Sequence, residues 1–251
     1  MGLKERFYPE SRFGGFTDTD GAITFYARVN ALLSPDDTVL DVGCGRGRAA
    51  EDKVPFRRNL RVLRGKCRRV VGIDLDEEAG ASNPCLDEFR PITKPTWPVA
   101  DGEVDLCLVD NVLEHVPDPA AFFAECARVI RPGGHLCIRT PNRRSYFGLG
   151  AWLIPERLHG RILRRAQPRR ADKDKFPTLY RCNTTGRIRR MLRRHGFDGC
   201  VYGYEAPPSY LAFSRLTYAL GVLHQRLAPR ALRLTLFTFA RRLEQPPGGQ
   251  T

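Results

Sequence analysis

Short apolar runs alternate with longer amphipathic stretches along most of the chain. Four of these runs read as buried strands: Thr38–Val42, Val70–Ile73, Val104–Val109 and Gly134–Thr140. Each one is bounded by glycine, proline or aspartate, the residues that most often form turns. Short buried strands that alternate with helices predict a mostly parallel sheet that is covered by helices on both faces.

The stretches between and around these strands carry apolar residues at helical spacing. We expect helices at Ile23–Leu33, Asp118–Ile130 and Thr184–His195, the last one ended by Gly196. Two further strands are predicted near Phe197–Tyr204 and Leu234–Ala240. The pattern therefore indicates an α/β fold.

Composition adds a strong positive charge to an otherwise ordinary globular chain. Hydrophobic residues make up 42% of the sequence and charged residues 27%, while the formal net charge is +13. The 41 basic residues include 35 Arg and 6 Lys, spread along the chain. Such a bias suits nucleic acid, anionic lipid or another acidic partner, but it also arises from codon bias towards arginine. The charge alone does not choose between these readings.

Neither a metal site nor a membrane span is predicted. The eight cysteines form no C-x-x-C pair and no zinc-like spacing with histidine, so we expect no metal. The first residues already include Lys4, Glu5 and Arg6, unlike a signal peptide, and no uncharged apolar stretch approaches about 20 residues. We expect a reduced, cytoplasmic protein, with peripheral contact to the inner face of the membrane left open.

The most specific motif is a glycine-rich turn after the first strand. Gly43, Gly45 and Gly47 alternate directly after Val42, and a backbone without Cβ atoms lets a ligand approach closely. We also expect a helix to begin here and to direct its first amides at the ligand. Asp74, at the end of the next strand, is suited to accept hydrogen bonds from ribose hydroxyls.

These residues resemble class I methyltransferases that depend on S-adenosylmethionine, in the subgroup with quinone-biosynthesis and glycan-tailoring enzymes. The resemblance covers roughly residues 36–142 and includes Asn111-Val112-Leu113-Glu114-His115-Val116 and Arg131-Pro132-Gly133-Gly134. It implies a Rossmann-like, doubly wound, seven-stranded sheet, mostly parallel, with helical insertions. It also implies an antiparallel last strand, which we place at Leu234–Ala240.

The resemblance also implies which residues hold the cofactor, S-adenosylmethionine. The loop of Gly43, Gly45 and Gly47 would lie under its methionine and ribose portions, with Asp41 the preceding acid. Asp74 matches the ribose-binding acid and Leu75 the residue near the adenine. Asn111 and Val112 match the segment that faces the methionine end.

The sequence departs from the family pattern at two places, and its glycine spacing disfavours a dinucleotide cofactor. Thr93 occupies the place where an aspartate often contacts the adenine amino group, and an arginine-rich insert around Arg57–Arg69 lengthens the path to Asp74. A dinucleotide fingerprint reads G-x-G-x-x-G, whereas this loop is G-x-G-x-G followed by Arg48. The spacing favours S-adenosylmethionine over a nicotinamide or flavin dinucleotide.

We interpret the chain as one methyltransferase domain, residues 1–251, built from a core and added segments. These are an N-terminal cap (1–37), the cofactor-binding core (38–142), an acceptor-side insertion (143–183), a core helix and strand (184–205), a helical insertion (206–230) and the last strand (231–245). The helical insertion carries apolar positions over Leu211–Leu227 together with Arg215, Arg226, Arg230 and Arg233. It is read either as a lid packed on the catalytic domain or as a helix at an anionic membrane surface.

Methyl transfer needs alignment above all, and an acceptor hydroxyl would also profit from a base. His115, with Glu114 beside it, is the candidate catalytic base, although a histidine at a helix start often has a purely structural role. We expect a small-molecule, saccharide or lipid-linked acceptor. The alternatives are an RNA methyltransferase, for which no base-stacking module is recognisable, and a protein that keeps the fold but has lost catalysis.

Overall fold

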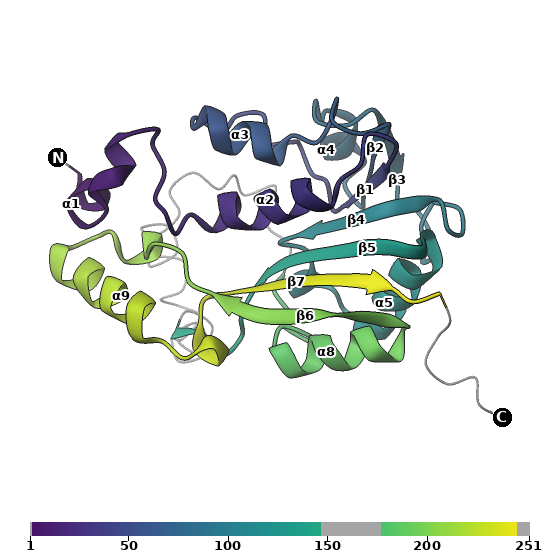
Figure 1. The fold of residues 1–251 in the computed structure, drawn as a ribbon. Helices are drawn as coiled ribbons and strands as arrows, with labels where there is room; N and C mark the ends of the chain where they lie inside the picture. The colour runs from purple at the N-terminus through teal and green to yellow at the C-terminus, as the bar shows by residue number, and fades with distance from the viewer. Residues whose placement is uncertain (1, 147–176, 245–251) are drawn as a thin grey trace.

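The computed structural model describes residues 2–146 and 177–244, so most of the 143–183 insertion lies outside the described residues. The described chain forms a seven-stranded sheet in the order β3-β2-β1-β4-β5-β7-β6 (Figure 1). The strands are β1 Thr38–Val42, β2 Arg69–Asp74, β3 Glu88–Pro91, β4 Val104–Asp110, β5 Ile130–Pro141, β6 Phe197–Tyr204 and β7 Thr235–Arg242.

Strand direction confirms the family's arrangement. β3, β2, β1, β4 and β5 pair in parallel, and β7 pairs antiparallel with both β5 and β6. The predicted strand at Leu234–Ala240 is therefore the antiparallel one. β3 was not predicted from the hydrophobic pattern, because its four residues, Glu-Phe-Arg-Pro, form a partly exposed edge strand.

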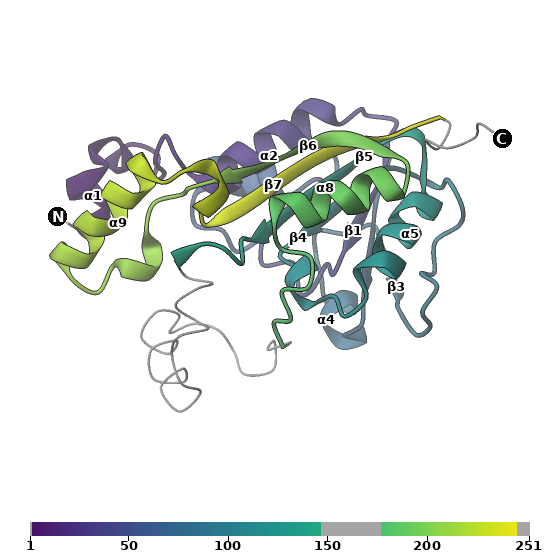
Figure 2. The same ribbon diagram turned by 90° about the horizontal axis from the view of Figure 1, so that it is seen from below.

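Helices cover both faces of the sheet. The helices are α1 Leu3–Phe7, α2 Gly21–Leu32, α3 Pro55–Arg61, α4 Glu77–Ala81, α5 Pro119–Val129, α8 Thr185–Arg194 and α9 Arg215–Leu227, with 3-10 turns η1 Pro9–Arg12, η2 Leu113–His115, η4 Ser209–Leu211 and η5 Arg230–Leu232. Figures 1 and 2 show α2 and α3 on one face and α5 and α8 on the other. Phe25 and Val29 of α2 pack on the first face, and Phe123 and Ile188 on the second.

Local sequence accounts for where these helices begin and end. The carboxylate of Asp20 accepts the amides of Ala22 and Ile23 at the start of α2, and Asp118 caps α5 in the same way. A side-chain oxygen at this position satisfies amides that have no partner within the helix. After α8, Gly196 adopts a positive φ of 74° that allows the chain to reverse into β6.

A small helical lobe stands beyond the carboxyl end of the sheet. α1 and α9 lie side by side there in both Figure 1 and Figure 2, joined by a cluster of Phe7, Tyr8, Tyr218 and Val222. The predicted helix at 206–230 is α-helical only over Arg215–Leu227, where the hydroxyl of Ser214 accepts the amide of Thr217 and caps the first turn. Among the described residues, no helix is long and apolar enough to cross a bilayer.

Candidate cofactor and active site

Strand register gathers the predicted site at one edge of the sheet. Val42 of β1 lies opposite Ile73 of β2 and opposite Val109 of β4. All three strands run in the same direction, so the residues that follow them emerge together. The glycine loop, Asp74 and Asp110 are thereby neighbours at the carboxyl edge.

Asp74 connects the end of β2 to the glycine loop. Its Oδ2 accepts the amide of Gly45 at 2.8 Å, and its Oδ1 accepts the amide of Asp76 at 2.9 Å. Gly43, Gly45 and Gly47 all have positive φ angles, of 66°, 51° and 70°, which side chains with a Cβ rarely adopt. The loop is therefore folded around the carboxylate that the sequence predicts for ribose binding.

Asn83 holds the same loop through hydrogen bonds to its backbone, and the sequence did not predict this role. Its side-chain amide donates to the carbonyls of Cys44 and Gly45, at 2.9 and 3.0 Å, and its Oδ1 accepts the amide of Cys85. A Cβ on Gly47 would lie only 2.2 Å from this Oδ1. The glycine at position 47 is thus required by Asn83.

The expectation that a helix begins at the glycine loop is wrong. Residues 48–51 form turns, and the first helix after β1, α3, begins only at Pro55. The arginine-rich segment near Arg57 supplies this helix, in which Arg57 pairs with Asp52 and Asp20. The amides of Gly43 and Cys44 donate to the carbonyl of Ile73, and that of Gly45 donates to Asp74, so these amides hold the loop in place.

A largely buried ion pair organises the carboxylates at this edge. The guanidinium of Arg139 donates to both oxygens of Asp110, at 2.7 and 2.6 Å, and the hydroxyl of Tyr26 donates to Oδ2 at 2.8 Å. Burial disfavours the charge of Asp110, but Arg139 and Tyr26 outweigh it and hold the pKa of Asp110 below its ordinary value. No described residue forms such a pair with Asp41, and burial, with Asp110 and Asp74 nearby, raises the pKa of Asp41 to about 7.

The segment after β4 carries Asn111 and Val112, two further residues of the predicted cofactor site. Asn111 has a positive φ of 57° and donates from its side-chain amide to Asp110 at 2.8 Å. Val112 reaches the glycine loop, since a Cβ on Gly43 would come within 2.5 Å of its Cγ2. The segment therefore contacts the glycine loop, which the resemblance places under the cofactor.

His115 follows on η2 beside a buried acid. Its Nδ1 lies 3.0 Å from the carbonyl of Pro177, and its Nε2 lies 3.9 Å from Oε1 of Glu114. Glu114 is buried and accepts the hydroxyl of Thr140 at 2.9 Å, and burial raises the pKa of Glu114. A carbonyl can only accept, so this contact places a proton on Nδ1.

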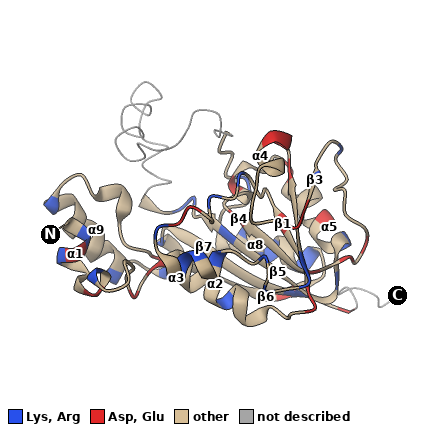
Figure 3. Cartoon of the chain, turned by 90° about the horizontal axis from the view of Figure 1, so that it is seen from above, with Lys and Arg blue, Asp and Glu red and all other residues tan. Residues whose placement is uncertain are grey.

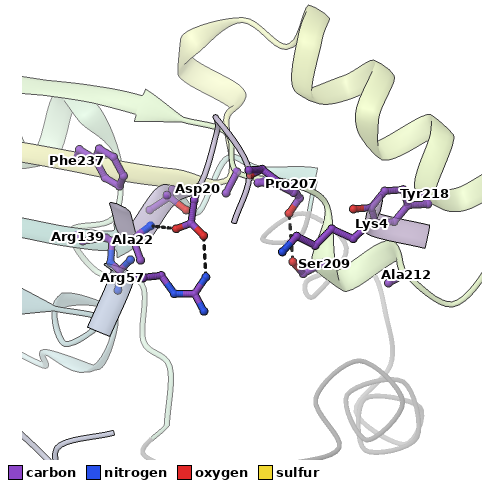
Figure 4. A pocket seen from close by; sticks show the side chains of 14 residues that line it. Lys4, Asp20, Ala22, Arg57, Arg139, Pro207, Ser209, Ala212, Tyr218 and Phe237 are labelled. Carbon is purple, nitrogen blue, oxygen red and sulfur yellow. Dashed lines mark hydrogen bonds and ion pairs between the residues drawn. The ribbon is translucent and has the colours of Figure 1, made fainter. Parts of the chain in front are cut away.

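A cavity of about 390 Å³ opens between the sheet and the helical lobe. Figure 4 shows Asp20, Arg57 and Arg139 along one side and Lys4 and Tyr218 along the other. Its volume lies within the usual range for small-ligand sites. Arg139 lines the cavity while it pairs with Asp110, so the cavity adjoins the carboxylate cluster.

Comparison with known proteins identifies the core. Residues 40–138 match a family model described as a methyltransferase domain. The chain therefore carries a class I methyltransferase domain. The cofactor of this domain is S-adenosylmethionine.

Curated relatives match this domain over part of their length. A probable S-adenosylmethionine-dependent methyltransferase of Mycolicibacterium smegmatis is 36% identical over 43% of this chain and 39% of its own. A ubiquinone biosynthesis O-methyltransferase of Thiobacillus denitrificans is 36% identical over 43% of this chain and 45% of its own. The chain thus matches less than half the length of these relatives.

Solved structures extend the likeness to the fold as a whole. A geranyl diphosphate C-methyltransferase from Streptomyces coelicolor, solved with S-adenosyl-L-homocysteine, superposes with a TM-score of 0.55 at 18% identity. The match covers 88% of this chain and 76% of that one, and at this identity it shows the fold alone.

The methyltransferase domain fits its cofactor at the glycine loop. A Cβ on Gly45 would meet no atom within 4 Å, so space adjoins the loop at this point. The two oxygens of Asp74 each accept one amide, and a carboxylate has about four acceptor positions, which leaves capacity for ribose hydroxyls. Leu75 is 69% exposed next to Asp74 and leaves an apolar surface beside the loop.

Alanine substitutions should distinguish the glycine that the folded loop requires from the glycine that leaves room for a ligand. We expect Gly47→Ala to lower the free energy of unfolding by about 2 kcal/mol or more, because the new Cβ meets Asn83 at positive φ. Gly45→Ala should cost only about 1 kcal/mol but weaken binding of S-adenosylhomocysteine, since its Cβ enters the space beside the loop. Urea unfolding and calorimetry measure the two effects. Unchanged affinity in Gly45→Ala would place the ligand elsewhere.

The raised pKa of Asp41 predicts a pH-dependent loss of stability. Between the ordinary pKa of an unfolded aspartate and about 7, the folded protein keeps a proton that the unfolded chain releases, so rising pH favours unfolding. Asp41→Asn removes this loss. Relative to wild type, it should gain on the order of 2 kcal/mol of stability between about pH 5 and about pH 8 in ligand-free urea unfolding. Asp198→Asn, at an exposed site on β6, is the control, and an identical pH response of the two variants would contradict the prediction.

Proposed function

We propose that this protein transfers a methyl group from S-adenosylmethionine to a small-molecule, saccharide or lipid-linked acceptor. The observation that carries the proposal is the Asp74 carboxylate, held by the amide of Gly45 at 2.8 Å beside the space that adjoins the loop. S-adenosylmethionine supplies an activated methyl carbon. The protein's part is to hold the cofactor and the acceptor in line.

The cavity beside Arg139 is the proposed acceptor site. It adjoins the carboxylate cluster through Arg139, and its walls mix charged side chains with apolar ones such as Phe237. A size of about 390 Å³ suits a small acceptor or one end of a longer molecule. The names of the relatives, a ubiquinone biosynthesis O-methyltransferase and a geranyl diphosphate C-methyltransferase, support acceptors of this kind.

Calorimetry with S-adenosylhomocysteine tests the cofactor half of the proposal. Wild type should bind, and Asp74→Ala should bind at least about tenfold more weakly, because hydrogen bonds to a charged group contribute roughly 1.5–3 kcal/mol each. Asp198→Ala, at an exposed position on β6, is the matched control and should bind like wild type. Uptake that is unaffected by Asp74→Ala, in a variant whose circular dichroism is native, would overturn the assignment of this site.

Isotope transfer tests the acceptor half separately. With methyl-labelled S-adenosylmethionine and a cell extract, the label should enter the small-molecule or lipid fraction. Label in the RNA fraction would instead assign an RNA acceptor. Binding without transfer to any fraction would indicate a protein that keeps the cofactor site but does not catalyse.

We propose His115 as the base that receives the acceptor's proton. The Pro177 carbonyl at 3.0 Å orients the ring and holds the proton on Nδ1, which leaves Nε2 as the proton-accepting nitrogen. η2 directly follows the segment of Asn111 and Val112, so the ring belongs to the cofactor side of the sheet. A base in this role typically contributes a factor of about 10² or more to turnover.

Replacing His115 separates this role from a structural one. We expect His115→Gln to lower turnover at saturating S-adenosylmethionine about a hundredfold, in an extract fraction on which wild type is active, while S-adenosylhomocysteine affinity stays within about twofold. A structural role would instead lower the urea midpoint together with the affinity. Undiminished turnover would exclude His115 as the base.

A further inference from the structure

Helix α9 is packed into the lobe by only one of its faces. Tyr218 and Val222 are buried against Phe7 and Tyr8, and Gly221 lets the helix approach Pro208 closely. The side-chain amide of Gln225 donates to Thr19 at 3.0 Å on the same side.

The opposite face of α9 consists of leucines that nothing in the described structure covers. Leu216, Leu220, Leu223 and Leu227 are 71%, 56%, 53% and 71% exposed. Their spacing of four, three and four residues places them on one stripe of the helix. Phe213, just before the helix, is 69% exposed as well. We call these five residues the leucine stripe.

The charge on α9 itself and on the segments next to it in sequence is positive. Residues 206–243 contain no aspartate or glutamate, and Arg215 and Arg226 on the helix, followed by Arg230, are all exposed. Figure 3 shows basic positions on α9 and no acidic one. Exposed leucines flanked by arginines are the composition of helices that lie in an anionic membrane interface.

We propose that the leucine stripe of α9 docks the protein peripherally on an anionic phospholipid bilayer. The apolar side chains would enter the boundary between headgroups and acyl chains, and the arginines would meet lipid phosphates. A second copy of this chain fits the same surface poorly, because a symmetric contact would bring Arg215 and Arg226 of both copies together without an acid on either helix. The lipid bilayer satisfies both the apolar and the charged part of the surface.

Docking would also orient the cavity with respect to the membrane. Tyr218, on the packed face of α9, lines the cavity together with Ala212 from the turn before the helix. The leucine stripe is therefore the outer side of a wall whose inner side faces the cavity. A bilayer bound there would lie next to the proposed acceptor site, but the docking itself does not depend on that assignment.

Vesicle flotation with the full-length protein tests the docking. Wild type should float with vesicles of phosphatidylcholine containing about one third phosphatidylglycerol and remain unbound with phosphatidylcholine alone. The double variant Leu220→Gln/Leu223→Gln should bind at least about tenfold more weakly, because two apolar anchors are lost. Arg226→Gln should weaken binding about fivefold and reduce its sensitivity to salt.

Two matched controls guard against general effects of the substitutions. Leu243→Gln removes a leucine that is 38% exposed after β7, and Arg190→Gln removes an exposed charge from α8; both should float like wild type. Equal flotation of the double leucine variant and wild type would overturn the proposal. So would light scattering that shows a dimer which the leucine substitutions dissociate, because the stripe would then be a protein interface.

Discussion

The pairing of Arg139 with Asp110 is the interaction on which the arrangement of the site depends. Parallel strands bring Asp41, Asp74 and Asp110 to one edge, where like charges in a poorly solvated region repel one another. Arg139 neutralises one of them with two hydrogen bonds, and its guanidinium also lies 5.5 Å from the ring of Tyr26. The same contact therefore joins β4, β5 and α2, and it leaves Asp41 as the group whose protonation responds to the surroundings.

The two halves of the site are stabilised by different means. The cofactor side is held by backbone hydrogen bonds to Asp74 and by Asn83, which fix the loop without help from a ligand. A loop that already has its shape loses little conformational entropy on binding. The cavity side is assembled from the lobe, whose short helix α1 buries no residue within itself and is held by aromatic contacts of Phe7 and Tyr8 with Tyr218.

Much of the fold could be predicted from the sequence, since buried strands and capped helices leave local patterns. β3 escaped because a short edge strand with charged residues has no apolar run. A helix was expected after Gly47 because a glycine-rich turn of this kind usually leads into one, but the structure places turns there. Asn83 was invisible because its hydrogen bonds go to backbone carbonyls some 38 residues away, which leave no trace in side-chain type. Periodicity revealed an amphipathic helix at α9 but not that its leucines face outward.

The cavity and the glycine loop are built from different parts of the chain. All the residues that line the cavity except Arg57 come from outside residues 40–138, which match the methyltransferase family, whereas Asp74 and the glycine loop lie inside them. Substitutions near the two ends of the chain can thus reshape the cavity without altering the glycine loop or Asp74.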